Sequence, residues 1–147
     1  MFFVEIAVLV VLLVVAIIDV RTQHIPDYLN LLLLFLGVAT VFLRGSLDLA
    51  GMLLGVAVLG SQWFVSRGKW MGSGDVYLIM RVGLILPHLS FMILTLIIAY
   101  ASAAFVALAL LRTGRITLAG RMPFAPFLAA GTGVAMVFGE RILSIVR

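Results

Sequence analysis

The sequence predicts an all-α polytopic membrane protein, a bundle of about six transmembrane helices formed by a single domain over residues 1–147. Hydrophobic residues make up 65% of the chain and charged residues only 11%, whereas a typical soluble domain is about half apolar and about a quarter charged. The apolar residues gather in runs that approach or reach the length of a membrane-spanning helix, about 17–25 residues. A soluble fold of this size could not bury so much apolar surface.

The first apolar run, 2–20, is expected to be a retained helix and not a cleaved signal peptide. It contains Glu5, has no Lys or Arg ahead of it, and continues into Asp19 without a small-residue cleavage site. The other long helices are expected at 28–43, 47–66, 90–111 and 123–143.

The segment 76–88 is short for a span, because a helix of about 13 residues reaches only about 20 Å, and Pro87 interrupts it. Loop charge nevertheless indicates that it crosses or nearly crosses the membrane. If it crosses, six basic residues lie on one face of the membrane, namely Arg21, Arg67, Lys69, Arg112, Arg115 and Arg121. Three lie on the other face, namely Arg44, Arg141 and Arg147. The richer face is expected to be cytoplasmic, which predicts a multi-pass protein of the inner membrane with its N-terminus outside.

Three acidic residues map to this same cytoplasmic face. Asp19 ends the first helix, Asp27 begins the second and Asp75 begins the fourth. Ionisable residues next to spanning segments commonly face the bundle interior and mark function. The alternatives are structural: Asp19 could pair with Arg21 or another loop arginine, and the other two could be first-turn acids favoured by the helix dipole. The remaining acids, expected at headgroup level, are Glu5, Asp48 and Glu140, and Asp48 is also placed at a helix start.

Asp19 and Asp75 together suggest acid–base chemistry. Two carboxylates held close together cannot both ionise easily, so they share one proton. One can take a proton from a water that attacks an amide carbonyl, while the other donates a proton to the carbonyl oxygen and then to the leaving amine. The chain has no cysteine and two histidines, His24 and His88, so neither a metal nor another cofactor is expected.

Gly72 and Gly74 flank Asp75 in the stretch GSGD. Glycine tolerates positive φ and lets another backbone approach closely. Beside a catalytic acid, this could admit an extended peptide substrate; the alternative is a flexible turn between two helices.

Three motifs resemble those of the type IV prepilin peptidase family. Residues 72–75 match its GxGD signature, and Asp19 is followed after six residues by Pro26 and Asp27, as in its D-x6-P-[DN] element. Residues 122–128, MPFAPFL, are similar to its PF-x-P-[FY]-L segment. The resemblance runs from the first expected helix to the sixth.

The resemblance implies that Asp19 and Asp75 are the catalytic aspartates of a GxGD protease. It further implies cleavage of short basic leader peptides from prepilin-like precursors (type IV or Flp pilins, or archaeal flagellin-like proteins) at the cytoplasmic membrane face, as in type IV pilus assembly. The expected partners are this substrate and the lipid bilayer, with no nucleic acid. Residues expected to bind substrate or shape the site are Gly72, Gly74, Pro26, Asp27, Tyr77, Pro123 and Pro126.

The two prolines of the last motif allow two interpretations. Pro123 and Pro126 could loosen the backbone hydrogen bonding of the sixth helix, which is tolerated where neighbours or a cavity satisfy the freed groups. They could equally mark the start of that helix.

Two features depart from the family pattern. Many members have lysine where Tyr77 stands, and Arg81, about one turn later, is expected either to supply a cation instead or to extend to lipid headgroups. Larger members also carry a cysteine tetrad and an N-methyltransferase activity. The absence of cysteine predicts the short, peptidase-only form.

Two other functions compete with this interpretation. The signal peptide peptidase and presenilin proteases pair GxGD with a Tyr-Asp motif, and no Tyr-Asp dipeptide occurs in this chain. A non-enzymatic proton-coupled carrier or assembly subunit could also use intramembrane acids. A carrier is expected to place an acid near mid-span, whereas these acids cluster at one face.

Overall fold

The computed structural model describes residues 2–114 and 122–146, which form helices and connecting turns. Arg115, Arg121 and Arg147, which contributed to the charge count, lie outside the described residues. The helices are α1 (Phe2–Thr22), α2 (Asp27–Arg44), α3 (Leu49–Ser66), α4 (Ser73–Ile85), α5 (Leu89–Arg112) and α6 (Ala125–Val146). Over this part of the chain the all-α prediction is confirmed.

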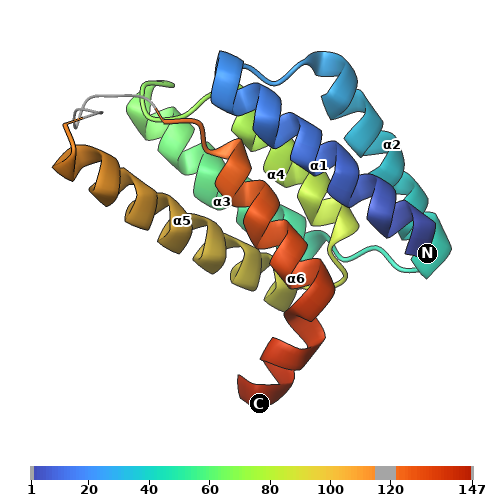
Figure 1. The fold of residues 1–147 in the computed structure, drawn as a ribbon. Helices are drawn as coiled ribbons and strands as arrows, with labels where there is room; N and C mark the ends of the chain where they lie inside the picture. Colours follow the sequence, from blue (N-terminus) through green and yellow to red (C-terminus); the bar gives the residue numbers. More distant parts are fainter. Residues whose placement is uncertain (1, 115–121, 147) are drawn as a thin grey trace.

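The helices form a closed ring in the order α1, α2, α4, α3, α5, α6, with α6 returning to α1 and a further contact between α4 and α6. Figure 1 shows that the α1–α2 and α3–α4 connections and the start of α6 lie at one end of the bundle, and that the N- and C-termini lie at the other. Segments distant in the sequence therefore meet at one end.

The outer surface of the bundle is apolar. Five of the described helices, all except α4, are long and apolar enough to cross a membrane, and only 22–28% of each span is buried within the protein. Large apolar side chains such as Phe35, Phe42 and Phe105 therefore project outward and are exposed. In water this surface would be strongly unfavourable, so the helices define a multi-pass membrane protein.

Helix α4 is the short helix of the ring, with 13 residues. It begins three residues earlier than predicted and ends at Ile85, before the predicted end of the segment. The residue before a proline is disfavoured in helical conformation, and Leu86, which precedes Pro87, is indeed extended with φ −70° and ψ 139°. The early start places Asp75 within the first turn.

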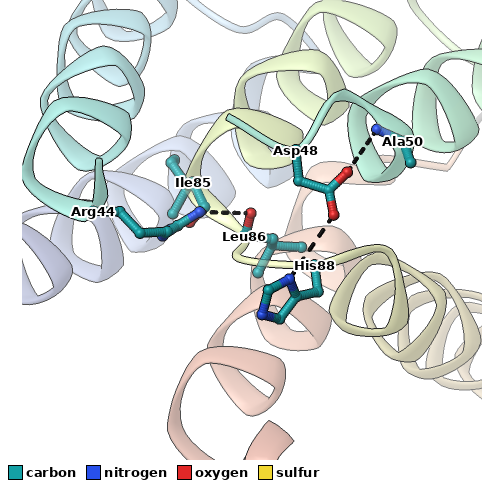
Figure 2. Close-up of polar contacts among 6 residues, drawn as sticks. All are labelled: Arg44, Asp48, Ala50, Ile85, Leu86 and His88. Carbon is teal, nitrogen blue, oxygen red and sulfur yellow. Dashed lines mark hydrogen bonds and ion pairs between the residues drawn. The ribbon is translucent and has the colours of Figure 1, made fainter. Parts of the chain in front are cut away.

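Arg44 satisfies the free carbonyl groups at the end of α4 (Figure 2). Its Nη1 donates a hydrogen bond to the carbonyl oxygen of Leu86 at 3.1 Å, and its Nη2 donates to the carbonyl oxygen of Ile85. A helix leaves its last carbonyls without partners inside the helix, and none can be left unpaired in lipid. Arg44, which the charge count placed in a loop, therefore connects the C-terminal end of α2 to the C-terminal end of α4.

Asp48 joins two further helix starts at the same end (Figure 2). Its carboxylate accepts a hydrogen bond from the Ala50 N–H at 2.9 Å, which caps α3. Its other oxygen lies 3.9 Å from Nδ1 of His88, the residue that precedes α5. The predicted position of Asp48 at a helix start is confirmed.

Glycines allow close contact between neighbouring helices. A Cβ on Gly83 of α4 would overlap the backbone of Met52 on α3, and a Cβ on Gly131 of α6 would overlap the carbonyl oxygen of Thr95 on α5. These two helix pairs therefore approach each other more closely than side chains would permit.

Replacing Gly83 with alanine is expected to destabilise the bundle, because the added methyl group forces α3 and α4 apart. Overpacking of this kind costs about 1–3 kcal/mol. The matched control is Gly60→Ala on α3, where the nearest atom to the new Cβ would be Val76 Cγ1 at 3.9 Å; this change should stabilise the helix by about 0.5–1 kcal/mol. Unfolding in detergent, followed by circular dichroism, measures both. Equal stability of the two variants would contradict the packing argument.

Replacing Arg44 with leucine is expected to lower the free energy of unfolding by roughly 2–4 kcal/mol, because each hydrogen bond from a charged donor contributes about 1.5–3 kcal/mol. Arg112→Leu is the control, since Arg112 is exposed at the end of α5. The same unfolding assay applies. A loss no larger than that of Arg112→Leu would show that Arg44 does not hold the end of α4.

Candidate active site

A cavity of about 250 Å³ is lined by residues of the α1–α2 and α3–α4 connections and of the approach to α6. Figure 1 shows these three segments at the same end of the bundle. The cavity is lined by residues from three separate stretches of the chain, 19–30, 72–77 and 122–123. The residues that line it are Asp19, Gln23, His24, Ile25, Asp27, Asn30, Gly72, Ser73, Gly74, Asp75, Tyr77, Met122 and Pro123. Of the residues expected from the sequence to form the site, only Pro26 and Pro126 are not among them.

Asp19 and Asp75 are the two acidic side chains that are buried in the described part of the chain. Their exposed fractions are 5% and 7%, although both line the cavity. A carboxylate withdrawn from water is costly unless hydrogen bonds or opposite charges compensate it. Two acidic side chains that line one cavity at such low exposure are candidates for a pair that carries out acid–base chemistry together.

The start of α6 compensates Asp19. The carboxylate oxygen Oδ2 accepts a hydrogen bond from the backbone N–H of Ala125, the first residue of α6, at 3.2 Å. Asp19 lies in the last turn of its own helix, where the dipole disfavours a negative charge, whereas the N-terminus of α6 favours one. The contact therefore stabilises this carboxylate and ties the first helix to the last.

Asp75 is compensated by its own helix. It is the third residue of α4, whose N-cap is Gly72, and its backbone N–H donates to the Gly72 carbonyl oxygen at 3.3 Å. A first-turn acid interacts favourably with the positive end of the helix dipole. The first-turn interpretation is thus confirmed, and the same residue also lines the cavity.

Three aromatic and polar side chains hold the start of α6 in place. The Phe124 ring lies against the Tyr100 ring of α5, with centroids 5.2 Å apart. The Tyr100 hydroxyl accepts a hydrogen bond from Nε2 of Gln62 on α3 at 2.6 Å. This chain of contacts fixes the residue that precedes Ala125. Sequence reasoning did not identify Gln62 or Tyr100, although polar side chains within spans are a signal that could have done so.

The prolines mark helix starts. Pro123 lies before α6, and Pro126 is its second residue, where the missing N–H removes a donor that has no partner inside the helix in any case. Of the two interpretations that the sequence left open for these prolines, the start of the helix is confirmed. Pro26 is the N-cap of α2, with φ −63° and ψ 139°, so Asp27 is a first-turn acid, also at the rim of the cavity.

The two glycines beside Asp75 do not use positive φ. Gly72 is extended, with φ −76° and ψ 154°, and Gly74 is helical; the positive-φ glycines of the described chain lie elsewhere. The conformational part of the glycine prediction is therefore wrong. Gly74 lines the cavity, and the nearest atoms to a Cβ there would belong to Ile25, at an ordinary 3.5 Å, so the protein itself has room for a small side chain at this position.

Tyr77 and Arg81 form a unit beside the cavity. The Arg81 guanidinium lies 5.6 Å from the centre of the Tyr77 ring, and its Nη1 donates to the Tyr77 carbonyl oxygen at 2.6 Å. Tyr77 lines the cavity, and both residues line an adjoining groove. A cation therefore lies close to the position where the family pattern places lysine.

Asn30 is a buried polar residue of the cavity that sequence reasoning missed. It is buried, with 6% of its surface exposed, and it lies one turn after Asp27 on α2. A carboxamide in an otherwise apolar run of this length is an available signal, because polar groups in spanning segments are costly and commonly functional.

A membrane helix bundle with two buried aspartates lining one cavity is the structural class that this chain defines. The family model of the type IV leader peptidase family matches residues 6–111, which include both aspartates. The chain belongs to the type IV leader peptidase family.

Two curated relatives carry the name prepilin leader peptidase/N-methyltransferase. The protein from Stutzerimonas stutzeri is 31% identical over 144 residues, and that from Pseudomonas aeruginosa is 33% identical over 144 residues. Each alignment covers 89% of this chain and 48% of the relative, so the chain spans about half the length of these relatives. No solved structure matches the chain. The peptidase-only form stays a prediction.

Proposed function

We propose that this chain is an aspartic endopeptidase that removes the short basic leader from prepilin-like precursors at the cytoplasmic face of the membrane. The observation that carries the proposal is the pair Asp19 and Asp75, both buried and both lining one cavity. Membership of the type IV leader peptidase family and the names of the two relatives support the same reaction.

In the proposed reaction, the two aspartates activate a water molecule. One carboxylate removes a proton from the water as its oxygen attacks the scissile carbonyl carbon, while the other carboxyl group donates its proton to the carbonyl oxygen. When the carbon–nitrogen bond breaks, a proton passes to the leaving amine and the pair again shares one proton. The N–H of Ala125 holds Asp19 throughout. No cofactor takes part in these steps.

The side chains around the cavity support its placement at the membrane surface. Trp63, Trp70 and Tyr28 are exposed at this end of the bundle, where Trp and Tyr are favoured at the boundary between lipid and water. Arg67 and Lys69 are exposed in the α3–α4 connection. Basic loops of this kind are typical of the cytoplasmic side, so the proposed orientation places the N-terminus outside.

A substrate with a transmembrane helix fits this position. The bond to be cut reaches the cavity while the apolar helix that follows it stays in the bilayer beside the protein. The bond must lie in an extended segment, because the peptide groups within a helix are already hydrogen-bonded to each other. The carrier alternative receives no support from the described residues, whose buried acids lie at one end of the bundle and not near mid-span.

Substituting either aspartate is expected to abolish cleavage. Asp19→Asn and Asp75→Asn keep the shape of the side chain and its hydrogen-bond acceptor but remove the acid–base function, which contributes about 10²- to 10⁴-fold to the rate. The control is Asp48→Asn, which keeps the cap on α3 at the opposite end of the bundle. The assay is cleavage of a purified precursor with a basic leader by the protein in bilayers, with the cut site read by mass spectrometry.

A rate for either aspartate variant within threefold of the wild type would contradict the proposed dyad. Failure of the wild-type protein to cleave any such precursor would contradict the proposed function itself. Circular dichroism of each variant separates loss of chemistry from loss of fold.

Gly74→Ala is expected to fold normally and to cleave poorly. The nearest atoms to the new methyl group would belong to Ile25, at ordinary distance in the free protein. Gly74 lines the cavity next to Asp75, so the added methyl group is expected to narrow the space in which an extended peptide approaches that residue. We expect a KM raised about tenfold or more with unchanged unfolding, since one lost contact of about 1.4 kcal/mol is a tenfold effect. An unchanged KM would show that the substrate does not approach this wall.

A further inference from the structure

Asn30 carries a hydrogen-bonding atom with no partner in the described protein. Its Oδ1 is buried and accepts no hydrogen bond from residues 2–114 or 122–146. Buried polar atoms are nearly always paired, and an unpaired one is destabilising by about 1–3 kcal/mol. Thr40, which is buried on the same helix, is paired within the helix: its hydroxyl donates a hydrogen bond to the Leu36 carbonyl oxygen at 2.7 Å. Asn30 needs a partner that the described chain does not supply.

The position of Asn30 indicates where that partner comes from. It lines the cavity of the two aspartates and also an adjoining groove of about 430 Å³ between α2 and α4. The groove is lined by Asp27, Tyr28, Asn30, Leu31, Tyr77 and Arg81. Tyr28, Leu31 and Tyr77 are exposed on the outer surface of the bundle, so the groove leads from that surface to the cavity, and Asn30 lies where the two meet.

We propose that Asn30 is a substrate-positioning residue whose side-chain amide accepts a hydrogen bond from a backbone N–H of the peptide that passes from the α2–α4 groove to the aspartates. The inference rests on the proposed function, because it requires a peptide substrate. An extended peptide presents free N–H groups, and a carboxamide offers an acceptor oxygen. The proposal requires Asn30 to turn about its last side-chain bond when the peptide binds, so that this buried oxygen faces the cavity. This contact involves the backbone of the substrate and not its side chains, so substrates of varied sequence can make it.

The experiment combines variants of Asn30 with substrates that lack one N–H. Asn30→Leu keeps a similar side-chain volume without hydrogen-bonding atoms, and Asn30→Ala serves as a second, smaller variant. The matched control is Thr40→Val on the same helix. The substrates are prepilin-like precursors in which an ester replaces one peptide bond at a time near the cut, the scissile bond excepted.

Asn30→Leu and Asn30→Ala are expected to raise KM about fivefold to tenfold with kcat largely kept, as for a lost binding contact. An ester at one position of the substrate should raise the KM of the wild-type protein by a similar factor. The same ester should not raise the KM of the Asn30 variants further. Such coupling between a residue and one substrate group identifies direct contact. Thr40→Val should respond to every ester as the wild type does.

Two outcomes overturn the inference alone. One is a KM equal to that of the wild type in both Asn30 variants. The other is that, at every position of the substrate, the ester raises the KM of the Asn30 variants by the same factor as it raises that of the wild type. In both cases the wild-type protein still cleaves and Asp19→Asn does not, so the proposed function stands. If the wild-type protein cleaves no precursor, the inference and the proposed function fail together.

Discussion

Two carboxylates buried at one end of an apolar bundle are the constraint on which this structure depends. Burying such groups is costly unless fixed dipoles and hydrogen bonds compensate. The starts of two helices provide this compensation: the Ala125 N–H at the start of α6 meets Asp19, and Asp75 lies in the first turn of α4. The C-terminal end of α1 and the N-terminal ends of α4 and α6 must therefore lie at the same level of the bundle. This requirement constrains how the ring of helices closes.

Contacts other than those of the carboxylates themselves keep these helix starts in place. The hydrogen bond between Gln62 and Tyr100, and the contact of Tyr100 with Phe124, fix the approach to α6. Arg44 pairs with two carbonyl groups at the far end of α4, those of Ile85 and Leu86 (Figure 2). The close contact at Gly83 holds α4 against α3. The geometry of the cavity thus depends on the whole ring.

The same arrangement relates the site to a membrane-embedded substrate. The cavity is formed at the end of the bundle, and the adjoining groove between α2 and α4 shares Asp27, Asn30 and Tyr77 with it. In the proposed reaction, the substrate's apolar helix remains in lipid while an extended segment enters along this groove. The helices on both sides position the acids, and the groove is the path that the proposal assigns to the substrate.

The sequence by itself determined the all-α fold, the long spans and the placement of Asp19 and Asp75 at the same end of the bundle. The thickness of the bilayer sets the length of each apolar run, and successive loops must lie on alternate sides of the membrane. It did not determine the bounds of α4 or the role of Arg44, and it left two interpretations open for the prolines of α6. It also did not single out Asn30. These features depend on contacts between segments far apart in the chain, such as Arg44 with the carbonyls of α4. Only the tertiary structure decided them, because a buried polar group must find its partner in space and the sequence does not state which segment supplies it.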